Sequence, residues 1–228
     1  MVYLYTYRFS VRLINKLKKC IMGKTDDTAE ISAIAHNTVE NVDSLNEDLN
    51  HWLACREVDK KFIDSIYHDV ISICSIDERC LVADYGCGTG VLVSKLKNDF
   101  PKIEIIGYDF SESKIRRCRS FYDVGPECFS RGSVYDPISR KFDVIIATEV
   151  LEHLEYPTIA VKNLLSALNT SGRLFLTVPD GRTDTYHGNI HFWSPESWKL
   201  YMEELAGSYG DIKVGKLAGK NFALVQRR

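Results

Sequence analysis

The chain has 228 residues, with 31 acidic and 29 basic side chains and a formal net charge of −2 at pH 7. That length suits one α/β domain with an extension, and the nearly balanced charge gives no reason to expect a nucleic acid as partner. The seven cysteines include no Cys-x-x-Cys pair and no metal-ligand spacing. This usage favours reduced thiols inside a cell over a disulfide framework, and we expect a cytoplasmic protein.

The first 24 residues carry charge of one sign. They hold six basic residues and no acid, so the remaining chain has a net charge of −8. Apolar residues recur there at helical spacing, at Tyr7, Val11, Ile14, Leu17 and Ile21. Such a basic amphipathic helix fits peripheral attachment to a membrane, a cover packed on the acidic domain, or a targeting segment. We divide the chain into residues 1–50, a basic helix with an acidic linker, and a main domain at 51–228.

A glycine loop is the most informative motif. An apolar strand is expected at Leu81 to Tyr85, and Gly86, Gly88 and Gly90 follow it directly. Helical spacing resumes at Val91. Glycine permits positive φ and close ligand approach, while the first amides of a helix attract anionic groups. A strand, a glycine loop and a helix in this order predict a site for a nucleotide-type cofactor.

A second apolar run, from Ile103 to Tyr108, ends at Asp109. In dinucleotide-binding folds an acid about 20 residues after the glycine loop binds the ribose hydroxyls, and Asp109 fits that distance. The dinucleotide fingerprint, however, requires glycine or alanine where this chain has Val91. A nicotinamide-dependent oxidoreductase is therefore disfavoured.

Asp84, together with the three alternating glycines, resembles motif I of class I S-adenosylmethionine-dependent methyltransferases, a family that includes the ubiquinone-type O-methyltransferases. Segments similar to later family motifs follow in order at 132–136, 142–148 and 171–178. The resemblance implies a Rossmann-like α/β fold with a seven-stranded, mostly parallel sheet and helices on both faces. It also implies a C-terminal antiparallel hairpin, which we expect at 211–214 and 222–226, with Gly215, Gly219 and Lys220 in the turn.

The same resemblance implies that S-adenosylmethionine is the cofactor. Asp84 would attract its ammonium group, amides of the glycine loop would receive its carboxylate, Asp109 would bind the ribose, and Asp136 would lie beside the adenine. The predicted cofactor-binding residues are Asp84, Gly86, Cys87, Gly88, Gly90, Asp109, Phe110, Asp136, Thr148 and Glu149.

Candidate catalytic residues follow the fourth and fifth strands. His153 is the first candidate for a general base, because imidazole titrates near neutral pH, and Glu149, His187 and His191 complete the set. Each histidine also has a structural interpretation. Glu149, Glu152 and His153 also resemble the Glu-x-x-Glu-His segment of ubiquinone-type and small-RNA O-methyltransferases, and this resemblance implies that they bind a divalent cation. On a helix these positions share one face, so the two carboxylates and the imidazole would converge on Mg²⁺ or another divalent cation, with His187 or His191 completing the shell.

We therefore predict methyl transfer from S-adenosylmethionine to a small-molecule acceptor. The favoured acceptor atom is a hydroxyl oxygen of a quinone precursor, sugar or other metabolite. A catalytically silent relative that serves as a scaffold is the main alternative, and the intact acids and glycines argue against it. The predicted location is the cytoplasm, with membrane association if residues 1–24 bind lipid.

Overall fold

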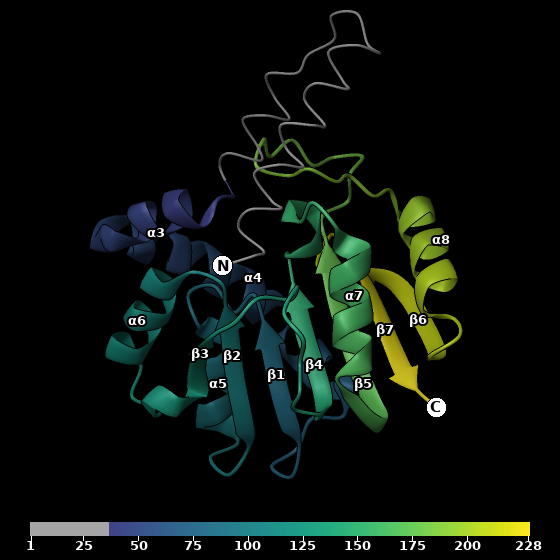
Figure 1. The fold of residues 1–228 in the computed structure, drawn as a ribbon, viewed down its shortest axis with the longest axis horizontal. Helices are drawn as coiled ribbons and strands as arrows, with labels where there is room; N and C mark the ends of the chain where they lie inside the picture. Colours follow the sequence, from purple (N-terminus) through teal and green to yellow (C-terminus); the bar gives the residue numbers. More distant parts are fainter. Residues whose placement is uncertain (1–36) are drawn as a thin grey trace, which may run out of the picture.

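A single seven-stranded sheet organises the protein, which we describe from a computed structural model over residues 37–228. The strand order is β3-β2-β1-β4-β5-β7-β6 (Figure 1). Strands β1 to β5 are parallel, whereas β7 is antiparallel to both of its neighbours. This arrangement confirms the predicted fold class. The strands are β1 Leu81–Tyr85, β2 Glu104–Asp109, β3 Phe129–Arg131, β4 Phe142–Thr148, β5 Leu168–Val178, β6 Gly210–Leu217 and β7 Lys220–Arg227.

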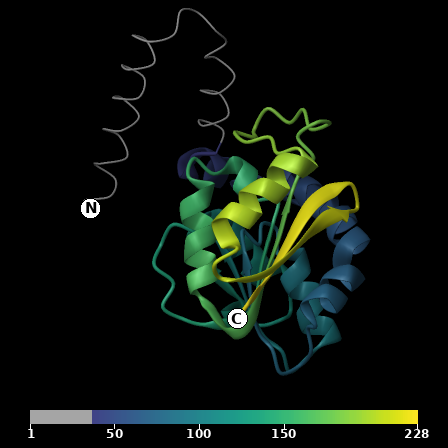
Figure 2. The same ribbon diagram turned by 90° about the vertical axis from the view of Figure 1, so that its right-hand side faces the viewer.

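Helices cover both faces of the sheet. In Figures 1 and 2, α4 and α5 lie on one side, and α7 and α8 lie on the other. The helices are α3 Val39–Glu47, α4 Leu49–Cys74, α5 Val91–Asp99, α6 Glu112–Phe121, α7 Pro157–Ser166 and α8 Pro195–Ala206. Two single-turn 3₁₀ helices, η1 Pro126–Cys128 and η2 Leu151–His153, connect the strands to the helices.

Each face of the sheet has its own hydrophobic core. Val144 and Ile146 of β4 pack with α4 and α5, while Ile145 on the opposite face packs with α7 and α8. Successive side chains of a strand point to opposite faces, so a strand buried on both sides must be apolar throughout. That requirement explains the apolar run from Val144 to Ala147 inside the segment 142–148, which we expected to be the fourth strand and which forms β4.

The C-terminal hairpin is longer than predicted, and its turn is shorter. Ala218 and Gly219 form the turn with φ of 46° and 82°. Gly215 instead pairs with Phe222 inside the ladder, and Lys220 opens β7 opposite Leu217. The predicted placement of Gly215 and Lys220 in the turn is therefore wrong, because strand pairing continues to the two-residue turn.

The segment before α8 fixes the position of the long loop at 179–194. Ser194 caps α8 by accepting a hydrogen bond from the Ser197 amide, and Pro195 takes the first helical position. Trp198 is buried, and Trp193 packs against its ring with centroids 5.5 Å apart. The cap and the tryptophan contact thus fix the end of this loop against α8.

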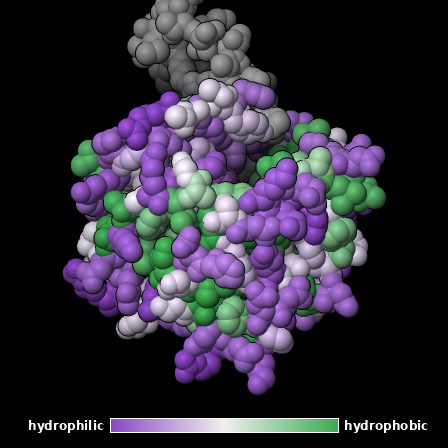
Figure 3. Space-filling view, turned by 180° about the vertical axis from the view of Figure 1, so that it is seen from behind, coloured by the Kyte–Doolittle hydropathy of each residue, from purple (hydrophilic) through white to green (hydrophobic). Residues whose placement is uncertain are grey.

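The predicted basic helix at residues 1–24 lies outside the described residues. The acidic segment before residue 50 contains α3, which packs on α6. The domain boundary predicted at residue 50 stays a prediction. No helix within residues 37–228 is long and apolar enough to cross a membrane. Hydrophilic residues cover most of the face shown in Figure 3, with apolar residues in small patches between them.

Candidate functional site

The glycine loop joins β1 to α5 in the conformation that its sequence predicts. Gly86, Gly88 and Gly90 have φ of 79°, 56° and 77°. The amides of Gly86 and Cys87 donate to the Tyr108 carbonyl at 2.7 and 2.9 Å, which ties the loop to the end of β2. A Cβ at Gly86 would lie 2.4 Å from Cγ2 of Val150. The loop therefore requires glycine for both its dihedrals and its close contacts.

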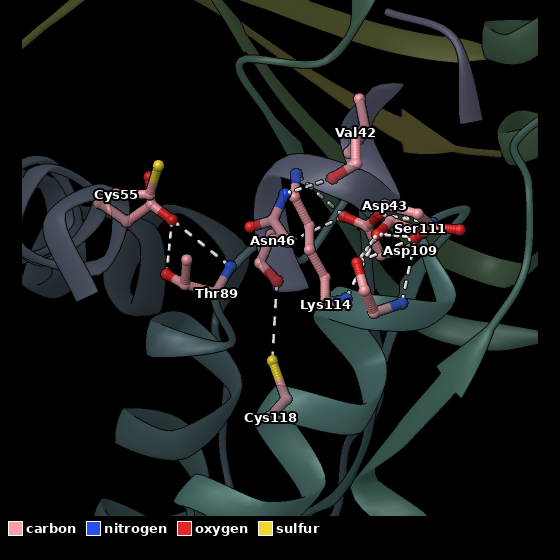
Figure 4. A network of polar contacts seen from close by, with 12 residues as sticks. Val42, Asp43, Asn46, Cys55, Thr89, Asp109, Ser111, Lys114 and Cys118 are labelled. Atoms are coloured by element: carbon pink, nitrogen blue, oxygen red, sulfur yellow. Dashed lines mark hydrogen bonds and ion pairs between the residues drawn. The ribbon is translucent and has the colours of Figure 1, made fainter. Parts of the chain in front are cut away.

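Asp109 lies at the carboxyl end of β2, directly beside this loop. Its Oδ2 accepts from the Gly88 amide at 3.0 Å, and its Oδ1 accepts from the Ser111 amide at 2.9 Å. The ammonium of Lys114 lies 3.9 Å from Oδ2 (Figure 4). The structure thus brings Asp109 and the glycine loop together, in the arrangement expected of a nucleotide-type site.

Asp84 is a buried acid without a partner in the described part of the chain. It lies on β1, two residues before the loop, and only 2% of its surface is exposed. Burial raises the pKa of its carboxyl to about 7, and the nearby charges of Asp109 and Asp59 add to the rise. A buried carboxylate without a counter-ion is costly, so this position favours a ligand with a positive charge.

Two acids from the N-terminal helices reach the same site, and sequence reasoning missed both. Asp43 of α3 accepts hydrogen bonds from Ser111 and Ser113, so it joins α3 to the start of α6 (Figure 4). Asp59 of α4 accepts from the Thr89 hydroxyl at 2.5 Å. Neither acid belongs to a local motif. Only the tertiary packing of α3 and α4 over the loop brings them there.

The other predicted cofactor-binding residues line the strand ends with different contacts. Cys87 is buried, and burial raises the pKa of its thiol well above the usual value, so it stays a neutral small residue. Phe110 follows Asp109, and Thr148 ends β4 opposite Thr177. Asp136 is exposed and accepts from the Ser133 amide within its own turn. Their contacts with a cofactor stay predictions.

A second polar group occupies the ends of β4, β5 and β7. Glu149 has φ of 54°, and its carboxylate accepts from the Thr177 hydroxyl at 3.1 Å and from the Lys220 ammonium at 2.5 Å. Burial raises the pKa of Glu149, against the opposing effect of Lys220. Lys220 is a further residue of this site that the sequence did not reveal, because it was expected in a turn.

The metal hypothesis assumed that Glu149, Glu152 and His153 share a helix face, and that geometry is wrong. Only Leu151–His153 form a helix, a single 3₁₀ turn, and Glu149 precedes it in a left-handed conformation. Glu152 is 1% exposed, and burial together with the charge of Glu149 raises its pKa well above the usual value. Among residues 37–228 no group of three or more His, Cys, Asp or Glu side chains could hold a metal ion.

The three candidate histidines have distinct environments. His153 is partly buried, and its Nδ1 lies 3.2 Å from the Gly188 carbonyl. Nε2 of His191 lies 2.9 Å from the Leu154 carbonyl, and its ring stacks on Trp193, so it anchors the loop at 179–194. His187 is exposed. The structure brings His153 and His191 to the η2 segment, next to the strand ends.

The protein is an α/β domain that binds a nucleotide-type cofactor at the carboxyl ends of its parallel strands. This class is defined by the order of the strands, the glycine loop and the acids beside it. A profile of the methyltransferase domain family matches residues 76–206. The chain belongs to this family, and its sheet and motif I define it as a class I, S-adenosylmethionine-dependent member.

Individual relatives are similar over part of their length. A trans-aconitate 2-methyltransferase of Variovorax paradoxus is 28% identical over 49% of this chain and 43% of that protein. A ubiquinone biosynthesis O-methyltransferase of Idiomarina loihiensis is 26% identical over 49% of this chain and 44% of that protein. The chain thus spans less than half the length of these relatives. Magnesium protoporphyrin IX methyltransferase from Synechocystis, solved with S-adenosylhomocysteine bound, shares the fold, with a TM-score of 0.58, 18% identity and coverage of 74% of this chain and 83% of that chain.

Proposed function

We propose that this protein transfers the methyl group of S-adenosylmethionine to a hydroxyl oxygen of a small molecule. The observation that carries the choice of cofactor is the presence of two acids, Asp84 and Asp109, beside the glycine loop. Asp84 is buried and unpartnered within residues 37–228, and Asp109 is held at the end of β2 by two amides. One acid suits the positively charged end of the cofactor, and the other suits the ribose hydroxyls.

The described residues fit the cofactor as a whole. The first amides of α5 follow Gly90 and point toward the loop, where they attract a carboxylate. The rings of Tyr85 and Tyr108 stack with centroids 4.7 Å apart and stiffen the adjoining ends of β1 and β2. When bound, S-adenosylmethionine supplies a methyl group on a sulfonium, which is an excellent leaving group. The protein must mainly align the acceptor with that methyl group.

His153 is our candidate for the base that removes the acceptor proton. If Nδ1 donates its hydrogen to the Gly188 carbonyl, the lone pair of the neutral ring lies on Nε2. A base needs that lone pair, and the loop contact would fix both tautomer and ring orientation. Glu149, which is paired with Lys220, follows β4 and precedes this histidine in the chain, at the strand ends where an acceptor would approach.

The relatives support an oxygen acceptor only in part. The Idiomarina protein is an O-methyltransferase, and the match covers 44% of it. A divalent cation is not part of the proposal, because the described side chains do not form a metal site. The proposed acceptor rests on the local chemistry of His153, and the proposed cofactor rests on the two acids and on Val91, which replaces the small residue that a dinucleotide site needs for close helix–strand packing.

The test is transfer of the labelled methyl group of S-adenosylmethionine to a panel of hydroxyl, carboxyl, amine and thiol compounds. We expect label in a hydroxyl acceptor, and we expect His153→Ala to lower turnover at least about tenfold while leaving cofactor affinity unchanged. His51→Ala is a matched control, because His51 is exposed on α4. Label only in carboxyl, amine or thiol compounds would contradict the proposed acceptor, and no cofactor binding at all would favour a scaffold.

A further inference from the structure

An acid from α4 lies directly over the glycine loop. Oδ2 of Asp59 is 2.5 Å from the Thr89 hydroxyl and 3.4 Å from the Thr89 amide. A Cβ at Gly88 would lie 3.3 Å from the same oxygen, so the carboxylate faces the apex of the loop. Asp59 is only partly buried, which leaves it accessible to a ligand on the loop.

The charge around this loop is strongly one-sided. Asp59, Asp84 and Asp109 interact with one another or with the same lysine, Lys114. Burial opposes the charge of Lys114, but Asp109 and Asp59 outweigh it and raise the pKa of its ammonium. Asp59 and Asp109 therefore share one cation, and the buried Asp84 has no partner in the described structure. The site needs further positive charge from a ligand.

The geometry points to Asp59 as a cofactor residue: we infer that its carboxylate binds the ammonium group at the amino-acid end of the cofactor, with Thr89 holding the carboxylate in place. The inference rests on the proposed function, because it assumes a cofactor that ends in an amino acid. Asp84 lies beneath the loop on β1, whereas Asp59 approaches from α4. The ammonium would thus be enclosed by acids from two elements that are distant in sequence.

A ligand pair separates this role from a structural one. S-adenosylhomocysteine carries the amino-acid end, and 5′-methylthioadenosine lacks both its ammonium and its carboxylate. Asp59→Asn keeps an oxygen that can accept from Thr89 but removes the charge. Because a hydrogen bond to a charged group is stronger than a neutral one, we expect Asp59→Asn to bind S-adenosylhomocysteine about ten- to one-hundredfold more weakly. Its affinity for 5′-methylthioadenosine should equal that of the unaltered protein.

Two control variants complete the experiment. Asp69→Asn removes the same charge from an exposed position of α4 and should change neither affinity. Thr89→Val removes the hydroxyl that holds Asp59 and should weaken S-adenosylhomocysteine binding selectively, by a smaller factor than Asp59→Asn. Titration calorimetry measures all the affinities, and circular dichroism confirms that each variant is folded.

Each remaining outcome overturns the inference in a recognisable way. Equal weakening of both ligands by Asp59→Asn would make Asp59 a brace for the loop. Tighter binding of S-adenosylhomocysteine would mean that Asp59 occupies the place of the cofactor's carboxylate. Unchanged affinities would exclude contact with the amino-acid end. If the unaltered protein binds neither ligand, the proposed function itself fails.

Discussion

The buried acid at Asp84 should make the cofactor-free protein less stable as pH rises. A free aspartate has a pKa of 3.8, and burial raises that of Asp84 to about 7 in the folded protein. Between these values the unfolded chain has lost the proton while the folded protein still keeps it. Because the pKa of Asp84 is raised on folding, this group lowers the free energy of unfolding as pH rises. The loss begins at about pH 4 and is complete above about pH 7.

The size of the effect follows from the same two pKa values. One unit of pKa difference corresponds to about 1.4 kcal/mol. The two pKa values therefore give a loss of unfolding free energy of at most roughly 4 kcal/mol above neutral pH. Asp84→Asn resembles the neutral acid in shape and cannot ionise. It should raise the free energy of unfolding by up to roughly 4 kcal/mol at about pH 8 and leave it nearly unchanged at about pH 4.

Urea denaturation of both proteins at the two pH values, without cofactor, measures this difference. The same variant should bind S-adenosylhomocysteine more weakly, because the ligand loses its charged partner. Stabilisation that is equal at both pH values would refute the electrostatic reasoning, and destabilisation at high pH would show that the ionised carboxylate has a favourable partner in the protein.

Three further predictions concern the cofactor site and its scaffold. Asp109→Ala should weaken binding of both S-adenosylhomocysteine and 5′-methylthioadenosine about ten- to one-hundredfold by calorimetry, since both carry the ribose; unchanged affinity would overturn the ribose assignment. Cofactor affinity should fall as pH decreases below about 7, because binding then requires Asp84 to lose its proton; a flat profile between about pH 5 and 8 would contradict this. Gly90→Ala should destabilise the protein by about 1–3 kcal/mol in urea, because a Cβ there would lie 2.8 Å from Phe129 at a φ of 77°, whereas Gly219→Ala, with no atom within 4 Å, should show only the smaller backbone cost. If the two alanine variants lose the same free energy of unfolding, the predicted clash at Gly90 is contradicted.

The parallel part of the fold was predictable because each central strand is apolar on both faces. The run Phe142–Thr148 and the loop from Gly86 to Gly90 each carry a strong local signal. Local signals failed where tertiary pairing decides the structure. Lys220 follows a glycine and resembles a turn residue, yet the ladder extends to it and directs its ammonium to Glu149.

The candidate site was predictable where one motif supplies its residues. Asp84 and Asp109 each stand at the end of a strand, next to the glycines that identify the loop. Asp59 comes from a long helix with no motif, and its distance from Thr89 depends on how α4 crosses the loop. The spacing of Glu149, Glu152 and His153 predicted one helix face, and that prediction was wrong. Glu149 has a left-handed conformation, and the segment after it forms a single 3₁₀ turn in place of an α-helix.

The most direct test of the account is titration of the purified full chain with S-adenosylhomocysteine, with NADH as the control ligand. The account predicts micromolar binding of S-adenosylhomocysteine and none of NADH, because Asp84 requires a positive charge and Val91 replaces the small residue of a dinucleotide site. Binding of NADH alone, or of neither ligand to the folded protein, would contradict the assignment of the glycine loop to S-adenosylmethionine.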